Sequence, residues 1–276
     1  MIAGRCWWCG AIADSREHKF KRSDLIREHG PAPYLDGAEL SGVGAGVSTR
    51  MRSNKSSPLK FKPNLCQPCN NARSQAFDQA YDRFVSWIFD HEDEVLASRS
   101  IDLHAVFGSD WEEAGLNVLR YFVKHICCRI ADLVADGHSA RLPGDVIDFL
   151  NGAGPGSSLS CEFYVEPALL RFCEAGVDDP LWVRPLWIDV IFGPAATGGK
   201  FIQSRWHYGW FSLAWALGPD ADGIHPFSAP LIPVPFWAEA FTPLVRPSSR
   251  PCAFAGRRRS TRRTFKLPWL LRASRG

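Results

Sequence analysis

Four cysteines fall into two Cys-x-x-Cys pairs that lie far apart in the sequence. Cys6 and Cys9 form the first pair, and Cys66 and Cys69 form the second after 56 intervening residues. Each pair can direct two thiolates at one ion, and two pairs complete the tetrahedral ligand set of a structural zinc site. Because four thiolates leave no coordination position for water, we predict that a Zn²⁺ ion joins the two segments without taking part in catalysis.

Residues able to do acid–base and metal chemistry lie beside both cysteine pairs. Glu17 and His18 follow the first pair, and Asn70, Asn71 and Arg73 come directly after the second. A carboxylate and an amide oxygen can hold a hard cation such as Mg²⁺, and a neighbouring imidazole can take a proton from water. Taken separately, a Glu-His pair is usually a surface feature and an Asn-Asn pair a helix N-cap. Their joint placement next to the predicted zinc site favours a catalytic set.

Short elements are expected to position these residues. Residues 15–20 are predicted to form a strand and a turn, and residues 59–62 alternate apolar and basic side chains as a half-buried strand does. Residues 37–57 are rich in Gly and Ser and are expected to form a flexible loop. After the second pair the apolar spacing changes to about 3.6, which predicts a helix from near Asn70 to about His91. The resulting order is strand, loop, strand, helix.

The motifs in this segment resemble those of a known enzyme family. They run, in order, Cys6-x-x-Cys9, Arg16-Glu17-His18 and Leu65-Cys66-x-x-Cys69-Asn70-Asn71-x-Arg73. This order is similar to that of the zinc-containing HNH endonucleases, and it occurs in the phage Holliday-junction resolvase of the ββα-metal (His-Me finger) superfamily. The resemblance covers about residues 4–90. It implies a small zinc-stapled ββα-metal (HNH) module with endonuclease activity.

The resemblance also implies a role for each site residue. His18 would be the general base that activates water, and Glu17 would be the acidic ligand of a catalytic Mg²⁺ or similar divalent cation. Asn70 would be the second ligand of that cation. Asn71 is its competitor, because neighbouring helix residues point about 100° apart and only one can face the ion. Arg73 would contact a phosphate.

Asn64 and a group of basic residues complete the predicted site. Asn64 corresponds to the family's middle asparagine, which orients the base. Five basic residues could hold the flanking phosphates without reading the bases, namely Lys19, Lys21, Arg22, Lys60 and Lys62. Residues 1–75 contain 12 Lys and Arg against 6 Asp and Glu, and residues 241–276 contain 10 against none, around an acidic middle. Basic ends of this kind favour contact with a polyanion, and the family favours DNA.

The remainder of the chain is predicted to form a larger mixed α+β domain. A helix is expected from about residue 110, and residues 161–166, 181–192 and 201–217 have the β-branched and aromatic content of strands. Seven of the eleven tryptophans lie between Trp111 and Trp237, where they are expected to be core residues. We therefore predict an α+β fold with an HNH-like module at 1–92, a Trp-rich acidic domain at 93–246 and a basic, disordered tail at 247–276.

Cysteine usage and hydropathy indicate the cellular context. Nine cysteines that include two tight pairs favour metal binding in a reducing compartment over a disulfide framework. No apolar run reaches the roughly 18 residues needed to cross a bilayer, and the N-terminus lacks the pattern of a secretion signal. We expect a cytoplasmic protein without a membrane partner. The histidines other than His18, including His125, lack ligand spacing and are interpreted as ordinary surface or core residues.

The sequence thus predicts a metal-dependent endonuclease that hydrolyses phosphodiester bonds of nucleic acid. One alternative is a zinc module that binds nucleic acid but has lost cleavage, with the second domain mediating a protein or ligand interaction. Another is that the zinc site is only a structural staple and that the Trp-rich domain carries the function, for instance as a ligand sensor. The first alternative predicts that loss of His18 is tolerated, and the second predicts no affinity for DNA.

Overall fold

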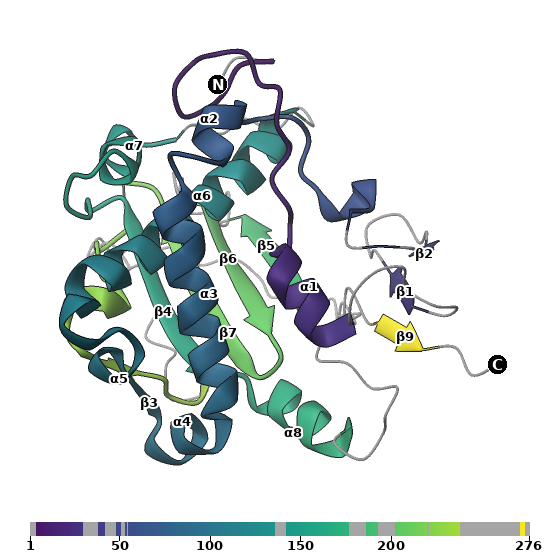
Figure 1. Cartoon of the computed structure of the whole chain (residues 1–276), viewed down its shortest axis with the longest axis vertical. Coiled ribbons are helices and arrows are strands. Elements are labelled where there is room, and N and C mark those ends of the chain that lie inside the picture. Colours follow the sequence, from purple (N-terminus) through teal and green to yellow (C-terminus); the bar gives the residue numbers. More distant parts are fainter. Residues whose placement is uncertain are drawn as a thin grey trace, which may run out of the picture.

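The computed structural model describes residues 4–29, 38–41, 48–50, 53, 55–135, 142–176, 186–192, 202–219, 221–237 and 271–273. Figure 1 shows their arrangement. The helices are α1 (Arg22–His29), η1 (Ser57–Leu59), α2 (Gln67–Asn70), α3 (Gln75–Asp90), α4 (Glu92–Ser98), α5 (Leu103–Phe107), η2 (Gly108–Asp110), α6 (Trp111–Ala135), α7 (Gly144–Leu150), α8 (Pro167–Gly176) and η4 (Pro226–Ser228). The strands are β1 (Ala38–Ser41), β2 (Ser48–Arg50), β3 (Ser100–Asp102), β4 (Leu159–Val165), β5 (Leu186–Phe192), β6 (Ile202–Tyr208), β7 (Phe211–Leu217), β8 (Leu231–Pro233) and β9 (Leu271–Ala273).

The largest sheet has four antiparallel strands in the order β4-β7-β6-β5. The predicted strand at residues 201–217 is in fact the hairpin of β6 and β7, in which Tyr208 pairs with Phe211 across a two-residue turn. Gly209 opens that turn at φ 56°, a conformation that glycine adopts without steric penalty. Every residue of β7 is buried, so this strand forms the centre of the sheet.

Helices α3 and α6 pack against each other and against one face of this sheet (Figure 1). The ring of Phe84 on α3 lies 5.6 Å from that of Phe163 on β4 and 6.2 Å from that of Phe211 on β7. Phe122 on α6 likewise lies 5.7 Å from Phe163 and 5.5 Å from Trp206 on β6. An aromatic layer therefore joins a helix from the first ninety residues to strands that follow residue 159.

The helix predictions hold with one change in boundary. Helix α3 buries an apolar stripe that includes Phe77, Tyr81 and Ile88, and it ends at Asp90, as the spacing of about 3.6 predicts. It begins at Gln75 instead of near Asn70, because Asn71 leaves helical geometry at φ −119° and ψ −87°. The helix expected from residue 110 is α6, which starts at Trp111.

The segments that carry the predicted catalytic residues pair in antiparallel fashion. Ser15 bridges to Leu65 and His18 bridges to Lys60, with the Ser15 amide donating to the Leu65 carbonyl at 2.9 Å. These are isolated bridges and not continuous strands, and helix α1 follows at Arg22. Of the order predicted for residues 15–90, the structure has the final helix, α3, whereas isolated bridges replace the two strands and α1, β1 and β2 lie between them.

The structure is a mixed α+β fold, as predicted, and its described core is continuous. One cluster of buried apolar residues runs from Cys6 through α3 and α6 to Val234. The division at residue 92 remains a prediction. In the segment predicted to be a flexible loop, β1 and β2 pair with each other, and β1 also pairs with β9 of the predicted tail; the other residues of 247–276 lie outside the described part. Among the described residues, no helix has the length and apolar character to span a bilayer.

Candidate metal centre and the adjoining charged site

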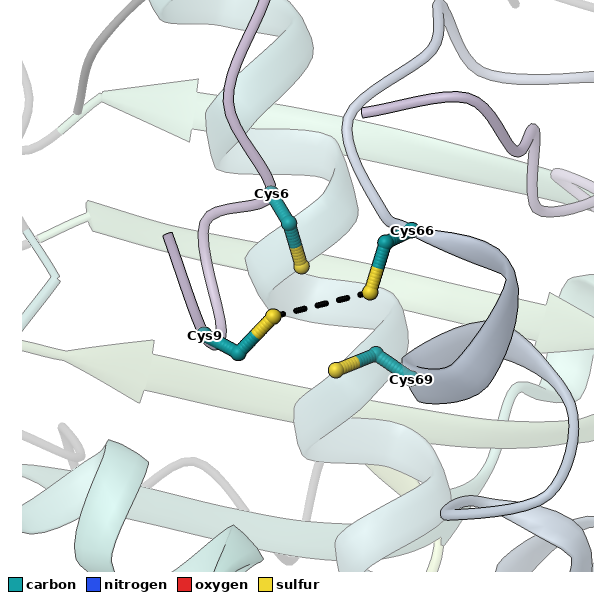
Figure 2. A group of neighbouring side chains, drawn as sticks. All are labelled: Cys6, Cys9, Cys66 and Cys69. Atoms are coloured by element: carbon teal, nitrogen blue, oxygen red, sulfur yellow. Dashed lines mark hydrogen bonds between the residues drawn. The ribbon is translucent and has the colours of Figure 1, made fainter. Parts of the chain in front are cut away.

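The four paired cysteines meet at one point. Their Sγ atoms all lie within 4.8 Å of one another, and the Sγ atoms of Cys9 and Cys66 are 3.5 Å apart. Figure 2 shows the side chains pointing toward a common centre, Cys6 and Cys9 from the N-terminal loop and Cys66 and Cys69 from the start of α2. Sulfur atoms of a tetrahedral Zn²⁺ site are about 3.8 Å apart for a Zn–S distance of about 2.3 Å. The cluster therefore has the size and the chemistry to hold a zinc ion.

Backbone geometry prepares each pair for this role. The Cys6 amide donates to the Ala11 carbonyl at 2.7 Å and the Gly10 amide donates to the Cys6 carbonyl at 2.9 Å, which folds the first pair into a tight turn. Cys66 is the N-cap of α2, and the Asn70 amide donates to its carbonyl at 3.0 Å. Three of the four thiols are buried, and Cys9 is exposed.

The segments that carry the predicted residues meet through two hydrogen bonds. The side-chain amide of Asn70 donates to Ser15 Oγ at 2.8 Å, and the Phe61 amide donates to the Glu17 carbonyl at 2.9 Å. Ser15 and Glu17 are two residues apart on the segment that pairs with residues 59–65. The Oδ1 atom of Asn70 is buried and accepts no hydrogen bond in the structure. It is therefore an acceptor suited to a ligand.

Glu17, in contrast, is already paired with a cation. Its Oε2 lies 2.7 Å from Nζ of Lys124 on α6, and its Oε1 accepts the His18 amide at 2.8 Å. Burial on its own would raise the pKa of Glu17, but Lys124, His125 and the His18 amide together outweigh burial and hold that pKa below its usual range. The pKa of Lys124 is correspondingly raised, because Glu17 and Asp78 outweigh the opposing effect of burial. Both groups are charged.

His18 is half-buried, and its backbone is held from two sides. It bridges to Lys60, and the ring of His125 on α6 is hydrogen-bonded to the His18 backbone. Burial lowers the pKa of His125 to about 4, so its imidazole is neutral at physiological pH. Two consecutive residues of α6, Lys124 and His125, thus hold the Glu17-His18 dipeptide.

Among the remaining predicted site residues, Arg73 and Asn71 are exposed and Asn64 is buried. Arg73 is exposed and stacks on the Trp8 ring at 4.6 Å, and its Nη2 donates to Asn151 Oδ1 at 2.6 Å. Trp8 Nε1 donates to the same oxygen at 2.8 Å, which ties the first cysteine turn to the end of α7. Asn71 is exposed, whereas Asn64 is buried and donates to the Cys128 carbonyl at 3.0 Å.

The five predicted phosphate-contacting residues also differ in exposure. Lys21 is largely buried, and its Nζ contacts Asp78 Oδ1 at 3.0 Å and Asp82 Oδ2 at 3.4 Å. It is therefore engaged inside the protein and is not placed to hold a phosphate. Arg22 and Lys62 are exposed, and Lys19 and Lys60 are half-buried.

Sequence reasoning missed four residues of this charged site, two on the α3 side and two on α6. Ser74 and Asp78 lie one and two turns beyond Asn70, and this helical spacing could have identified them. Lys124 and His125 belong to a helix more than a hundred residues later in the chain. The only sign of Lys124 and His125 in the sequence is that two polar residues interrupt the apolar pattern of this helix.

A second buried carboxyl lies one turn into α1. Asp24 Oδ2 accepts from the Tyr81 hydroxyl at 2.8 Å, and its Oδ1 lies 3.1 Å from Nη1 of Arg27, which also donates to Tyr208 on β6. Burial raises the pKa of Asp24 to about 7, despite the opposing effects of the Tyr81 hydrogen bond and of Arg27. Its ionisation is therefore coupled to the folding of the chain.

Asp24 is expected to make the protein less stable as the pH rises. A carboxyl whose folded pKa is raised from 3.8 to about 7 stabilises the fold below pH 3.8, and this contribution is lost as the pH rises through about 7. The loss should be on the order of 3 kcal/mol between about pH 4 and pH 8. Urea unfolding of the wild type and of Asp24→Asn across this range measures it. A free-energy difference between the two proteins that does not change with pH would contradict the assignment.

Comparison with known proteins identifies no relative for the chain. A scan against models of protein families finds no match, and searches of curated proteins and of solved structures also find none. The resemblance to HNH endonucleases therefore rests on the motifs of residues 4–90. What the structure adds to them is the four-cysteine cluster.

Proposed function

We propose that residues 4–90 form an HNH-type nuclease module that hydrolyses phosphodiester bonds of nucleic acid, with DNA as the expected substrate. The observation that carries the proposal is the hydrogen bond between Asn70 and Ser15, beside the four-cysteine cluster. It joins the segment with Glu17 and His18 to the residue that follows the last cysteine. The motif order of an HNH module calls for these two segments to meet, and the bond therefore supports the proposal.

In the proposed reaction His18 is the general base. Its imidazole takes a proton from a water molecule, whose oxygen attacks the phosphorus while the bond to the 3′ oxygen breaks. The leaving oxygen then takes a proton from solvent. Arg73 is exposed beside the cysteine cluster and presents a guanidinium that can bind a phosphate of the substrate strand.

The two predicted metal ions differ in how well the residues fit them. The four thiols fit Zn²⁺, whose proposed role is structural. For a catalytic Mg²⁺, the unpaired Oδ1 of Asn70 is a suitable acceptor, but Glu17 does not fit, because its carboxylate is neutralised by Lys124 at 2.7 Å. No step of the proposed reaction therefore depends on a metal ion bound to Glu17.

Nuclease activity is expected to fall at least a hundredfold when His18 is replaced by alanine, because a positioned general base contributes about 10²–10⁴ in rate. Zinc-loaded wild type and His18→Ala are incubated with supercoiled plasmid, single-stranded DNA and RNA, each with and without Mg²⁺ or Mn²⁺. His104→Ala, which removes an exposed histidine on α5, is the matched control. Equal cleavage by wild type and His18→Ala, or no cleavage of any substrate by the wild type, would contradict the proposal.

The ion pair between Glu17 and Lys124 favours a second candidate function. If the module has lost cleavage, it would bind nucleic acid through exposed basic residues such as Arg22 and Lys62. In that case wild type and His18→Ala bind DNA with equal affinity and neither cleaves it. Charge-reversal variants of Arg22 and Lys62 should then weaken binding and reduce its dependence on salt.

A further inference from the structure

Lys124 lies at the centre of a cage of oxygen atoms. Its Nζ is 2.7 Å from Glu17 Oε2, 3.2 Å from Ser74 Oγ and 3.4 Å from both carboxylate oxygens of Asp78. These acceptors come from the extended segment before α1, from the turn before α3 and from α3 itself. An ammonium group has three N–H donors, and three side chains surround it.

The amine at the centre of the cage is buried, although the Asp78 side chain is 30% exposed. The Lys124 side chain is fully buried, and that of Glu17 is only 14% exposed. Taking a charge out of water costs several kcal/mol unless it is paired and hydrogen-bonded, so an amine at this depth requires its carboxylates. Conversely, the carboxylates require a cation.

A second lysine shares one of these carboxylates, that of Asp78. Lys21 Nζ contacts Asp78 Oδ1 at 3.0 Å, and Lys21 and Lys124 lie 5.0 Å and 5.7 Å from the centre of the Tyr121 ring. Two ammonium groups, those of Lys21 and Lys124, therefore already face the carboxylates of Glu17, Asp78 and Asp82. A divalent ion entering the cage would meet both of them at close range.

With Lys124 in place, the spacing of the oxygen atoms around its Nζ suits an amine and not a metal. Its nitrogen–oxygen distances are 2.7 to 3.4 Å, whereas Mg²⁺ binds oxygen at about 2.0–2.1 Å and tolerates little deviation from that distance. Lys124 also lies on α6, where the ring of the next residue, His125, holds the His18 backbone. The same helix thus supplies the positive charge and fixes the position of the predicted general base.

We infer that the Lys124 ammonium is the resident cation of a site formed by Glu17, Ser74 and Asp78, and that it occupies the position for which the sequence predicts a divalent metal. The inference goes beyond the proposed nuclease function and does not depend on it. It implies that any chemistry at His18 proceeds without a metal on Glu17. It also implies that removal of the amine leaves a latent divalent-cation site with two carboxylates and a hydroxyl.

The test is Mn²⁺ binding by zinc-loaded protein, measured by electron paramagnetic resonance and by the shift in melting temperature. Lys124→Met removes the charge and keeps the length of the side chain, and Lys55→Met, at an exposed lysine, is the matched control. We expect the wild type and Lys55→Met to have no Mn²⁺ site that depends on Glu17. Lys124→Met should bind one Mn²⁺ at least tenfold more tightly than the wild type and should melt several degrees higher in its presence.

Two results would overturn the inference. One is a single Mn²⁺ site in the wild type that Glu17→Gln abolishes. The other is a folded Lys124→Met protein that gains no Mn²⁺ site. If Lys124→Met does not fold, Mn²⁺ binding by the wild type is compared with Mn²⁺ binding by Glu17→Gln. Equal binding by the two proteins supports a resident amine. A Mn²⁺ site that is present in the wild type and lost in Glu17→Gln refutes it. Because the measurement is metal binding, a failure of DNA cleavage does not affect the outcome.

Discussion

Cys69→Ser is expected to lose its zinc and to unfold the whole chain. A structural zinc ion in small metal-binding domains contributes about 10–16 kcal/mol of apparent binding free energy, and the total stability of a domain is about 5–15 kcal/mol. The cluster is not peripheral here. Cys6, Cys66 and Cys69 belong to the continuous core, and the ring of Trp8, between the first two cysteines, stacks on Phe77 of α3. Without the ion, four thiols that anchor both turns lose their common partner.

Zinc content and circular dichroism at increasing temperature measure this effect. The wild type should contain one zinc per chain, and treatment with a strong chelator should reproduce the loss of helix seen in Cys69→Ser. Cys127→Ala is the matched control, because Cys127 is fully buried on α6 and lies outside the cluster. It should keep its zinc and lose only about 1–2 kcal/mol. A Cys69→Ser protein that melts at the temperature of the wild type would show that the cluster carries no structural ion.

Phe84→Ala is expected to destabilise the protein by about 3–5 kcal/mol in a single unfolding transition. Phe84 is fully buried on α3, and its ring lies within 5.8 Å of those of Phe163 and Phe227, both later than residue 92. Truncation leaves a cavity at the place where the first segment meets the sheet. The loss of stability should therefore affect the first segment and the sheet in the same unfolding transition.

Urea unfolding followed by tryptophan fluorescence and by zinc release tests this coupling. Both signals should have the same midpoint in the wild type, and both should move together in Phe84→Ala. Phe172→Ala, which truncates a 39% exposed ring on α8, is the control and should change the unfolding free energy by well under 1 kcal/mol. Zinc release at a separate midpoint would mean that residues 1–92 unfold as an independent unit.

Features set by local spacing could be predicted from the sequence. The cysteine pairs, the apolar stripe of α3 and the start of α6 each lie in a short window, where residue types and period suffice. The hairpin turn at Gly209 was missed because β6 and β7 both have aromatic and apolar residues up to the turn. Helix α1 was missed because its eight residues, from Arg22 to His29, have little apolar character.

The environment of the candidate site could not be predicted in the same way. Motif order brings Glu17 and Asn70 to the same region, but it does not tell which cation pairs with Glu17. Lys124 is 107 residues from Glu17 in the sequence, and only the tertiary packing of α6 beside the segment before α1 brings the two charges together. Lys21 was predicted to contact phosphate for the same reason. Its partners Asp78 and Asp82 lie on α3, and the sequence indicated only a packing role for this helix.

The contacts of α6 with the Glu17-His18 dipeptide limit where the chain can be cut into separately folding fragments. A fragment that stops after Asp90 would expose the aromatic side of α3 to water and leave the Glu17 carboxylate without its amine. Such a fragment should aggregate and should not fold as an independent domain. A recombinant version of this segment should therefore include residues 111–135 along with the cysteine turns.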